Sequence, residues 1–454
     1  MTANSDFSST KPLRLQRRRS LLDFLRHGGA NIVGNWYDTA YDKPFISSRR
    51  LMRRFCVAND PQSVRQILVS NADNYRKSIV LRGLLAPSLG EGLILSEGKD
   101  WQRRRRAIAP AFNPKRIHAY VDPMLVETRK MLGRWDRWPV GKPIDIFAEM
   151  TQLALAIVCR TLFSLDREGI VSQLREILGR CYHAKKRIPI ADLLGFPRWI
   201  PRRGLGKAKV AATDLDRILF ALIAERRQVD IGEDLLSMLL EWREEGGFAD
   251  RQIRNEIATF LVAGHETTAV TMAWTFYLLA THPEAEARLF GELAKELKGR
   301  EFGAADFSRL SFLRAVLDES LRLYPPAHTI LREPFADDQV CGHEVRTGAI
   351  VLVVPWLLHR HRRYWNRPDA FEPERFLNKR EDKKYIYIPF GIGPRGCVGA
   401  SFAMMEAMAV VATVATRYKL RLASDVPVEP VGLITLKPGN SLPMYLQARD
   451  QSPL

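Results

Sequence analysis

The chain has 454 residues, of which 46% are hydrophobic, and its 69 Lys and Arg outnumber its 51 Asp and Glu, for a net charge of +18. This size and apolar content suffice for a large core, and no Gly/Ser-rich or Pro-rich stretch divides the chain, which excludes an architecture of small domains on long linkers. The five cysteines form no C-x-x-C pair, which argues against a zinc cluster or a disulfide framework and predicts a reducing compartment, the cytoplasm.

We therefore expect a basic tail over residues 1–30 and a single domain over residues 31–454. The positive charge favours acidic partners. Nucleic acid is not expected among them, because the basic residues are spread along the chain without a zinc finger, an RNA-recognition signature or a basic zipper. No apolar run reaches the length that spans a bilayer, the longest being 268–280 and 348–358, so no transmembrane anchor is predicted.

The first predicted elements are a strand over residues 54–57 and a helix that follows it. Asp60 and Pro61 supply a cap and a first-turn proline for a helix that runs through Leu68. Next, the run from Gly98 to Arg106 predicts a helix on which Trp101 and Arg105 lie on one side, four positions apart. An arginine fork pairs with carboxylates, although solvated charge is the simpler interpretation for any one neighbouring arginine.

A long apolar segment capped by Asp250 extends to about Thr281, where a His-Pro pair ends it, and predicts a central helix. Its middle reads Ala263-Gly264-His265-Glu266-Thr267-Thr268. A glycine and hydroxyls that bond back to carbonyls weaken a helix there, so we expect a local bulge with room for a ligand. The alternative is that the acid and the threonines satisfy one another in a core.

Two motifs follow on the C-terminal side of this helix. Glu319 and Arg322 are three positions apart on a predicted helix, and Arg375 lies in a later Pro-Glu-Arg-Phe run. Alone, such a pair is usually a surface ion pair. The second motif is Phe390-Gly-Ile-Gly-Pro-Arg-Gly-Cys397-Val-Gly, a lone cysteine in a glycine-rich loop before an apolar helix that opens at Ala400. Backbone amides that crowd the sulfur would favour the thiolate, which suits a metal ligand, and the alternative is a buried structural cysteine.

The cysteine run resembles the haem-binding signature of the cytochrome P-450 monooxygenases, Phe-x-x-Gly-x-Arg-x-Cys-x-Gly, at every specified position. The small-Gly-x-acid-Thr, Glu-x-x-Arg, Pro-Glu-Arg-Phe and Trp-x-x-x-Arg patterns of that family also occur here, in the family's order. The resemblance implies a mainly α fold with a smaller β-rich region. It also implies haem b (iron protoporphyrin IX) as the cofactor, bound between the long central helix and the cysteine-loop helix, with Cys397 as the metal ligand.

The resemblance further implies a role for each motif. Glu266 and Thr267 would flank the oxygen site and deliver protons, and Glu319, Arg322 and Arg375 would form a structural triad. The residues expected to hold the haem are Trp101, Arg105, Arg332, Phe390, Arg395 and Cys397. The residues expected to line the substrate pocket are Phe260, Ala263, Ala327, His328, Thr329, Ile330, Leu433 and Ile434, although a packed core histidine is the favoured interpretation of His328. Residues 76–96 would form a lid.

The implied activity is insertion of one oxygen atom from dioxygen into a lipophilic substrate, such as a fatty acid, terpenoid or steroid. Electrons would come from NAD(P)H through a reductase and an acidic ferredoxin or flavodoxin. The candidate docking residues on the cysteine side are Arg103, Arg104, Arg106, Lys115, Arg116, Lys383 and Lys384. A peroxide-using or peroxide-rearranging haem enzyme and a non-catalytic haem sensor remain alternatives, and the Glu266-Thr267 pair argues against both.

Overall fold

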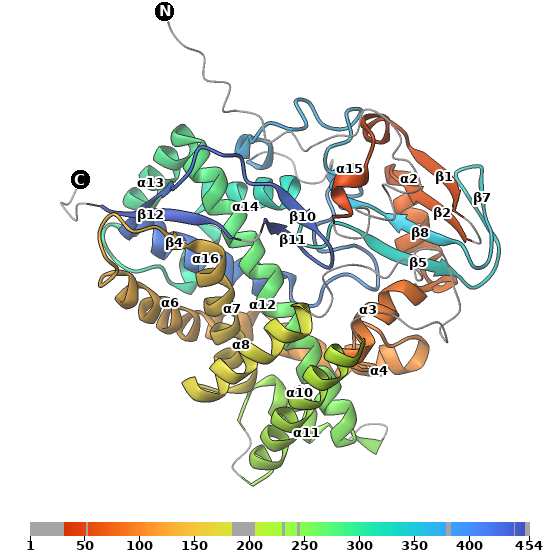
Figure 1. The fold of residues 1–454 in the computed structure, drawn as a ribbon, viewed down its shortest axis with the longest axis horizontal. Coiled ribbons are helices and arrows are strands. Elements are labelled where there is room, and N and C mark those ends of the chain that lie inside the picture. The colour runs from red at the N-terminus through yellow and green to blue at the C-terminus, as the bar shows by residue number, and fades with distance from the viewer. Residues whose placement is uncertain are drawn as a thin grey trace, which may run out of the picture.

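The longest helix, α12 (Asp250–Thr281), crosses the middle of the molecule, and the other helices pack around it (Figure 1). Its bounds agree with the sequence prediction, but the cap is Ala249. Asp250 is the first helical residue, and the Gln252 side chain accepts from the Ala249 N–H at 3.0 Å. The helix ends at His282 because Pro283 opens the next helix, α13, and cannot continue the hydrogen-bond ladder.

The computed structural model describes residues 31–50, 53–183, 205–228, 232–242, 246–377, 383–439 and 441–449, so the predicted tail over 1–30 lies outside it. The chain is mostly helical, as predicted, with small β-sheets. The other α-helices are α2 (Pro61–Arg65), α3 (Ile79–Leu89), α4 (Gly98–Ile108), α5 (Pro114–Ala119), α6 (Val121–Trp135), α7 (Ile146–Phe163), α8 (Glu168–His183), α10 (Leu205–Arg226), α11 (Leu235–Glu241), α13 (Pro283–Leu297), α14 (Ser311–Leu323), α15 (Pro355–Leu358) and α16 (Ala400–Arg417).

A five-stranded sheet in the order β1-β2-β8-β5-β3 lies to one side of α12 (Figure 1). Within it, β2 and β8 are parallel and the other neighbours are antiparallel. The remaining sheets are β4-β12-β9, β10-β11 and β6-β7. The strands are β1 (Phe45–Arg50), β2 (Arg53–Ala58), β3 (Tyr75–Lys77), β4 (Ile144–Asp145), β5 (Ile330–Pro334), β6 (Asp338–Val340), β7 (His343–Val345), β8 (Ile350–Val353), β9 (Tyr418–Leu422), β10 (Pro430–Gly432), β11 (Leu436–Pro438) and β12 (Pro443–Ala448).

Asp60 caps α2 as predicted, because its carboxylate accepts from the backbone N–H groups of Gln62 and Ser63 at 2.9 and 3.0 Å. The helix then changes to a π-helical turn over Gln66–Ser70. This turn brings Leu68 against the glycine-rich loop, where its carbonyl oxygen would be 2.0 Å from a Cβ on Gly393.

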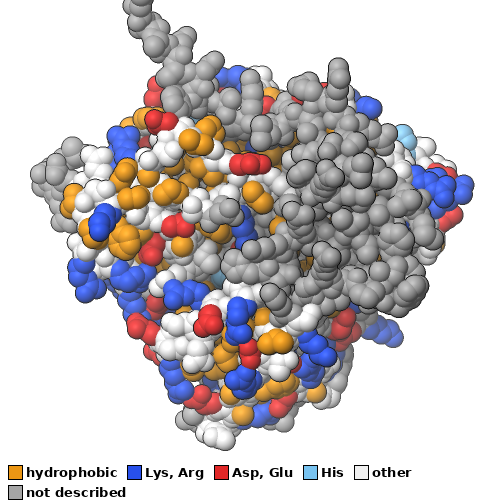
Figure 2. Space-filling view, in the orientation of Figure 1, with side chains coloured by type: hydrophobic (Ala, Val, Ile, Leu, Met, Phe, Trp, Pro, Cys, Tyr) orange, Lys and Arg blue, Asp and Glu red, His pale blue; other side chains and the backbone are white. Residues whose placement is uncertain are grey.

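The prediction that no apolar run is long enough to span a bilayer does not hold for two helices, α7 and α16. Each has 18 residues and passes a test of length and composition. Most of each helix is nevertheless buried inside the molecule, and core helices pass the same test. Over the described surface, Figure 2 shows Lys and Arg side chains interspersed with Asp and Glu around α8, α10 and α11, with no single basic patch on that part.

Candidate active site

A cavity of about 320 Å³ lies between the middle of α12 and the loop that precedes α16. All six residues that the sequence predicts to hold a cofactor line it, as do Thr267 and the predicted pocket residues Phe260, Ala263, Ala327 and Ile330. These side chains come from positions far apart in the chain. The cavity therefore joins the cysteine motif, the Trp-x-x-x-Arg motif and the central helix in one site.

The cysteine loop is held by its own backbone. The Cys397 N–H donates to the Phe390 carbonyl at 2.9 Å and the Gly396 N–H donates to the Gly393 carbonyl at 3.0 Å. Gly393 has a φ of +78° and no room for a Cβ, so no other residue fits there. Cys397 is open to the cavity although protein surrounds it on its other sides. Burial raises the pKa of its thiol, while the Gly399 backbone N–H and Arg105 act in the opposite direction.

The cavity is lined by four cationic side chains, Lys77, Arg105, Arg332 and Arg395, and Lys77 lies close to both Arg332 and Arg395. Arg105 donates to the Gly396 carbonyl at 3.0 Å. Burial, together with the charges of Arg332 and Arg395, lowers the pKa of Lys77 well below its usual value. Burial and the charge of Arg395 lower the pKa of Arg332 to about 10. Buried cations that repel one another in this way require an anion beside them.

The carboxylate that pairs with Arg395, that of Glu97, also faces Lys77 and Arg332. Arg395 pairs with Glu97, donates to the Ser96 carbonyl at 2.7 Å, and lies 4.2 Å over the ring of Trp101. One carboxylate thus faces several cations. A flat ligand with two carboxylates would balance the remaining positive charge. A thiolate below the cavity and cations at its rim are the donor set that an iron porphyrin requires, so these residues fit a haem. The sequence did not point to Lys77, which lies on β3 with no motif around it.

The α12 wall of the cavity is formed by Ala263, Gly264, Thr267 and Thr268. Thr267 donates to the Ala263 carbonyl at 2.6 Å and Thr268 donates to the Gly264 carbonyl at 3.0 Å. The predicted bulge is wrong, because α12 is an unbroken α-helix here. A glycine is required at position 264 because of packing. A Cβ there would be 2.9 Å from the Val158 side chain of α7, which packs directly against α12.

Glu266 does not lie on this wall. Adjacent residues of a helix point in different directions, so while Thr267 faces the cavity, Glu266 lines a second cavity of about 680 Å³ with His265 and Tyr182. Its Oε1 accepts from Lys437 Nζ at 2.5 Å, and among the described residues no hydrogen bond to its Oε2 is found. The prediction that Glu266 and Thr267 together flank one site is therefore corrected. Lys437, on β11, was not found from the sequence.

The remaining predicted pocket residues also need correction. Leu433 and Ile434 line the second cavity, and His328 and Thr329 line neither. His328 is buried, its Nδ1 is 2.9 Å from the Thr329 hydroxyl, and its Nε2 is 3.1 Å from the Leu433 carbonyl. Burial lowers its pKa to about 4, so it is a neutral core histidine, which was the favoured interpretation.

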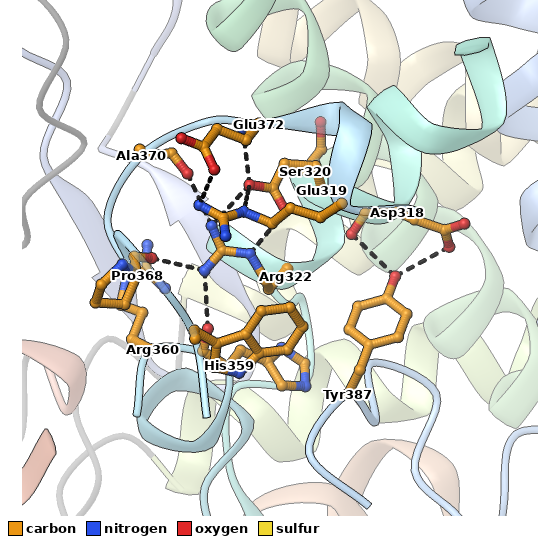
Figure 3. A network of polar contacts seen from close by, with 12 residues as sticks. Asp318, Glu319, Ser320, Arg322, His359, Arg360, Pro368, Ala370, Glu372 and Tyr387 are labelled. Carbon is orange, nitrogen blue, oxygen red and sulfur yellow. Dashed lines mark hydrogen bonds and ion pairs between the residues drawn. The ribbon is translucent and has the colours of Figure 1, made fainter. Parts of the chain in front are cut away.

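Glu319 and Arg322 lie side by side (Figure 3), Arg375 joins them, and none of the three lines the cavity. Arg322 donates to both carboxylate oxygens of Glu319 at 2.7 Å, and Arg375 Nε donates to Oε1 at 3.3 Å. Arg322 and Glu319 are fully buried, and Arg322 also donates to the carbonyls of His359, Pro368 and Ala370. The cluster thus ties α14 to the loop that follows α15.

The predicted docking residues differ in their exposure. Arg104 is only 3% exposed and pairs with Glu256 at 2.5 Å and Asp100 at 2.8 Å, so it is not available to a partner. Arg103 donates to the Gly247 carbonyl and lies over a phenyl ring. The exposed members of the set are Arg106, Lys115 and Lys384, and the half-buried ones are Arg103, Arg116 and Lys383.

Comparison with known proteins gives consistent findings. A family model described as Cytochrome P450 matches residues 20–442. The chain is 36% identical to cyclooctat-9-en-7-ol 5-monooxygenase of Streptomyces melanosporofaciens, over 81% of this chain and 80% of that protein. It is 33% identical to cyclooctatin synthase of the same species, over 84% and 83%. The crystal structure of the cytochrome P450DA heme domain matches with a TM-score of 0.81 and 25% identity, over 97% of both chains.

Proposed function

Since this chain belongs to the cytochrome P450 family and is one of its monooxygenases, we propose that it inserts one oxygen atom from dioxygen into a neutral lipophilic small molecule, a terpenoid above all. The observation that carries the proposal is the apolar wall of Phe260, Ala263, Ala327 and Ile330 in the same cavity as Cys397. Two relatives support the terpenoid class, because their names denote a cyclooctatenol monooxygenase and a cyclooctatin synthase. Fatty acids and steroid-like molecules are the other classes to test.

The cofactor in this proposal is haem b, with Cys397 as its metal ligand and its carboxylates against Lys77, Arg105, Arg332 and Arg395. When bound, it supplies the redox and oxygen-activating chemistry. Phe390 covers the thiolate side, and Trp101 holds Arg395 in place through its ring. The apolar residues of the wall exclude water and position the carbon to be oxidised, since neutral lipophilic molecules bind such a surface best.

Proton supply is the proposed task of Thr267 and Glu266 on the two sides of α12. The Thr267 hydroxyl lies on the cavity wall and can pass a proton to a group bound there. The Glu266 carboxylate faces the second cavity, and a side-chain rotation is needed to bring it toward Thr267. In this arrangement, the ion pair with Lys437 holds the Glu266 carboxylate on the side of α12 that faces the second cavity.

A titration of the ferric protein with terpenoids, fatty acids and steroids tests the substrate class. A high-spin shift of the haem absorption band with terpenoids alone is the expected result, and a shift with another class alone would contradict it. Thr267→Ala tests the proton role, because electrons should then be used without matching product. Unchanged coupling in that variant would refute the assignment.

The electron donor in this proposal is an acidic ferredoxin or flavodoxin with its NAD(P)H reductase, reaching the cysteine side in the cytoplasm. Charge complementarity to the exposed residues Arg106, Lys115 and Lys384 supports this docking face. The double variant Lys115→Glu/Lys384→Glu should slow reduction by a given acidic partner. Lys209→Glu is the control, because it reverses an exposed charge outside the proposed docking face. Lys209 lies on α10, which packs against α3, α8 and α12. Equal rates in both variants would exclude this face.

A peroxide-using enzyme is the second candidate, and one observation favours it. Glu266 lies outside the haem cavity and is paired with Lys437, so the acid and the hydroxyl do not meet in the described conformation. The argument from this pair against peroxide chemistry is weaker than the sequence suggested. Product formed from hydrogen peroxide alone, with no turnover from NAD(P)H and redox partners, would establish this alternative.

A further inference from the structure

The segment from Gly90 to Ser96, between α3 and α4, forms one wall of the haem cavity through the side chains of Leu93 and Ile94. It lies directly on α12. A Cβ on Gly90 would be 2.2 Å from Asn255 Oδ1, and a Cβ on Gly92 would be 2.2 Å from Thr259 Oγ1. Side chains at these glycines would push the segment off the helix, so their absence allows the close approach.

One carboxylate connects this segment to its surroundings. Glu256, in the second turn of α12, is fully buried. Its Oε2 accepts from the Leu93 backbone N–H at 3.0 Å, and its Oε1 accepts from Arg104 Nη1 at 2.5 Å. Burial raises the pKa of this carboxyl, and the facing Arg104 opposes the rise.

Arg104 carries the connection to the cofactor end of the cavity. It lies on α4, where Asp100 accepts from its Nε at 2.8 Å, and the same helix presents Trp101 and Arg105 to the cavity. Glu256 therefore contacts the substrate-side wall through one oxygen and the cofactor-holding helix through the other. An ordinary buried ion pair would bind Arg104 alone and leave the Leu93 N–H to another acceptor.

We infer that Glu256 is a positioning residue for substrate binding, which fixes the Leu93–Ile94 wall at a set distance from the α12 wall of the cavity. This inference rests on the proposed use of the cavity for a lipophilic substrate, although it does not depend on the terpenoid class. A neutral amide cannot replace the carboxylate, because it has one accepting oxygen for two donors. Glu256→Gln therefore leaves either Arg104 Nη1 or the Leu93 N–H without its present acceptor, while Arg104 keeps its bond to Asp100.

The test uses two ligands of the haem iron that differ in size. Imidazole is small and does not extend to the wall, whereas 4-phenylimidazole projects a ring into the cavity. For Glu256→Gln we expect the dissociation constant of 4-phenylimidazole to rise roughly tenfold, the usual effect of losing one buried hydrogen bond, with imidazole changed less than twofold.

Two further variants separate positioning from general stability. Asp234→Asn breaks another buried ion pair, with Arg226 at 2.5 Å, which does not line the cavity, so it should lower the melting temperature without changing the ratio of the two dissociation constants. Gly92→Ala should displace the same wall without removing a charge and should raise that ratio, even if Glu256→Gln does not fold. An unchanged ratio in Gly92→Ala, or equal weakening of both ligands in Glu256→Gln, would overturn the inference. Terpenoid titrations that fail while the ratio changes would instead refute only the substrate class.

Discussion

Glu406 should be replaceable with a gain in stability, because it is a fully buried acid with no partner in the described part of the chain. It lies on α16, and neither of its carboxylate oxygens has a hydrogen-bond partner among the residues that the structure describes. Burial raises its pKa well above the usual value of 4.5. The acid is thus protonated in the folded protein over a range of pH in which the unfolded chain ionises it.

The magnitude follows from two contributions. A neutral polar group buried without a partner costs about 1–3 kcal/mol in proteins, and methionine of similar size removes this cost. In addition, each unit by which the folded pKa exceeds the unfolded pKa costs about 1.4 kcal/mol. Between the two pKa values the folded state binds more protons than the unfolded state, so the wild type loses stability as pH rises from about 4.5 towards the folded pKa. Glu406→Met should therefore gain roughly 1–3 kcal/mol at pH 5, and more at pH 7.5.

Urea unfolding of the haem-bound proteins, followed by tryptophan fluorescence, measures this difference at pH values from 5 to 8. Glu406→Gln is the matched control, because it keeps a buried polar group but removes the titration. Its advantage over the wild type should grow with pH, while the gap between Gln and Met should stay constant. A Met variant that is less stable than the wild type, or a difference that does not depend on pH, would show that Glu406 has an unrecognised partner and would refute the reasoning.

Three other changes have defined expectations. Gly264→Val should cost about 1–3 kcal/mol by overpacking against Val158, and adding Val158→Ala should recover most of the loss in thermal unfolding. Lys77→Met should speed transfer of haem to apomyoglobin, because one cation of the rim is lost, and an unchanged rate would mean that Lys77 does not touch the cofactor. Glu319→Gln should cost about 3–5 kcal/mol, because Arg322 is left buried and unpaired, and little holoprotein should be recovered; normal yield and melting would exclude a structural role for the cluster.

The sequence predicted those parts of the site whose geometry is local. The loop around Cys397 is a run of neighbouring residues, and the Glu319–Arg322 pair is set by one helical turn, so spacing alone predicts both contacts. The bounds of α12 were also predictable, because a proline ends it and apolar periodicity runs through it. Five of the six predicted haem-holding residues belong to a short motif, whereas Arg332 belongs to none and was expected only from the resemblance, and all six line one cavity.

The parts that the sequence did not predict depend on partners far along the chain. Lys437 reaches Glu266 from a strand, and Arg104 reaches Glu256 across 152 positions, so no spacing could indicate either pair. Arg104 stood in a run of arginines and suggested a charged surface, whereas the fold buries it. Gly264 suggested a bulge because its helix propensity is poor, but the approach of α7 explains the glycine.

The cationic end of the cavity also has a consequence for how the protein is made. Lys77, Arg332 and Arg395 lie close together at the cavity, and among the described residues Glu97 is the carboxylate that offsets their charge. Their mutual repulsion should favour local opening of the newly made chain at this point, which would expose it to proteases. Incorporation of the cofactor closes it, so the yield of intact protein in a producing cell should track the supply of iron and haem precursors more closely than the level of its messenger RNA.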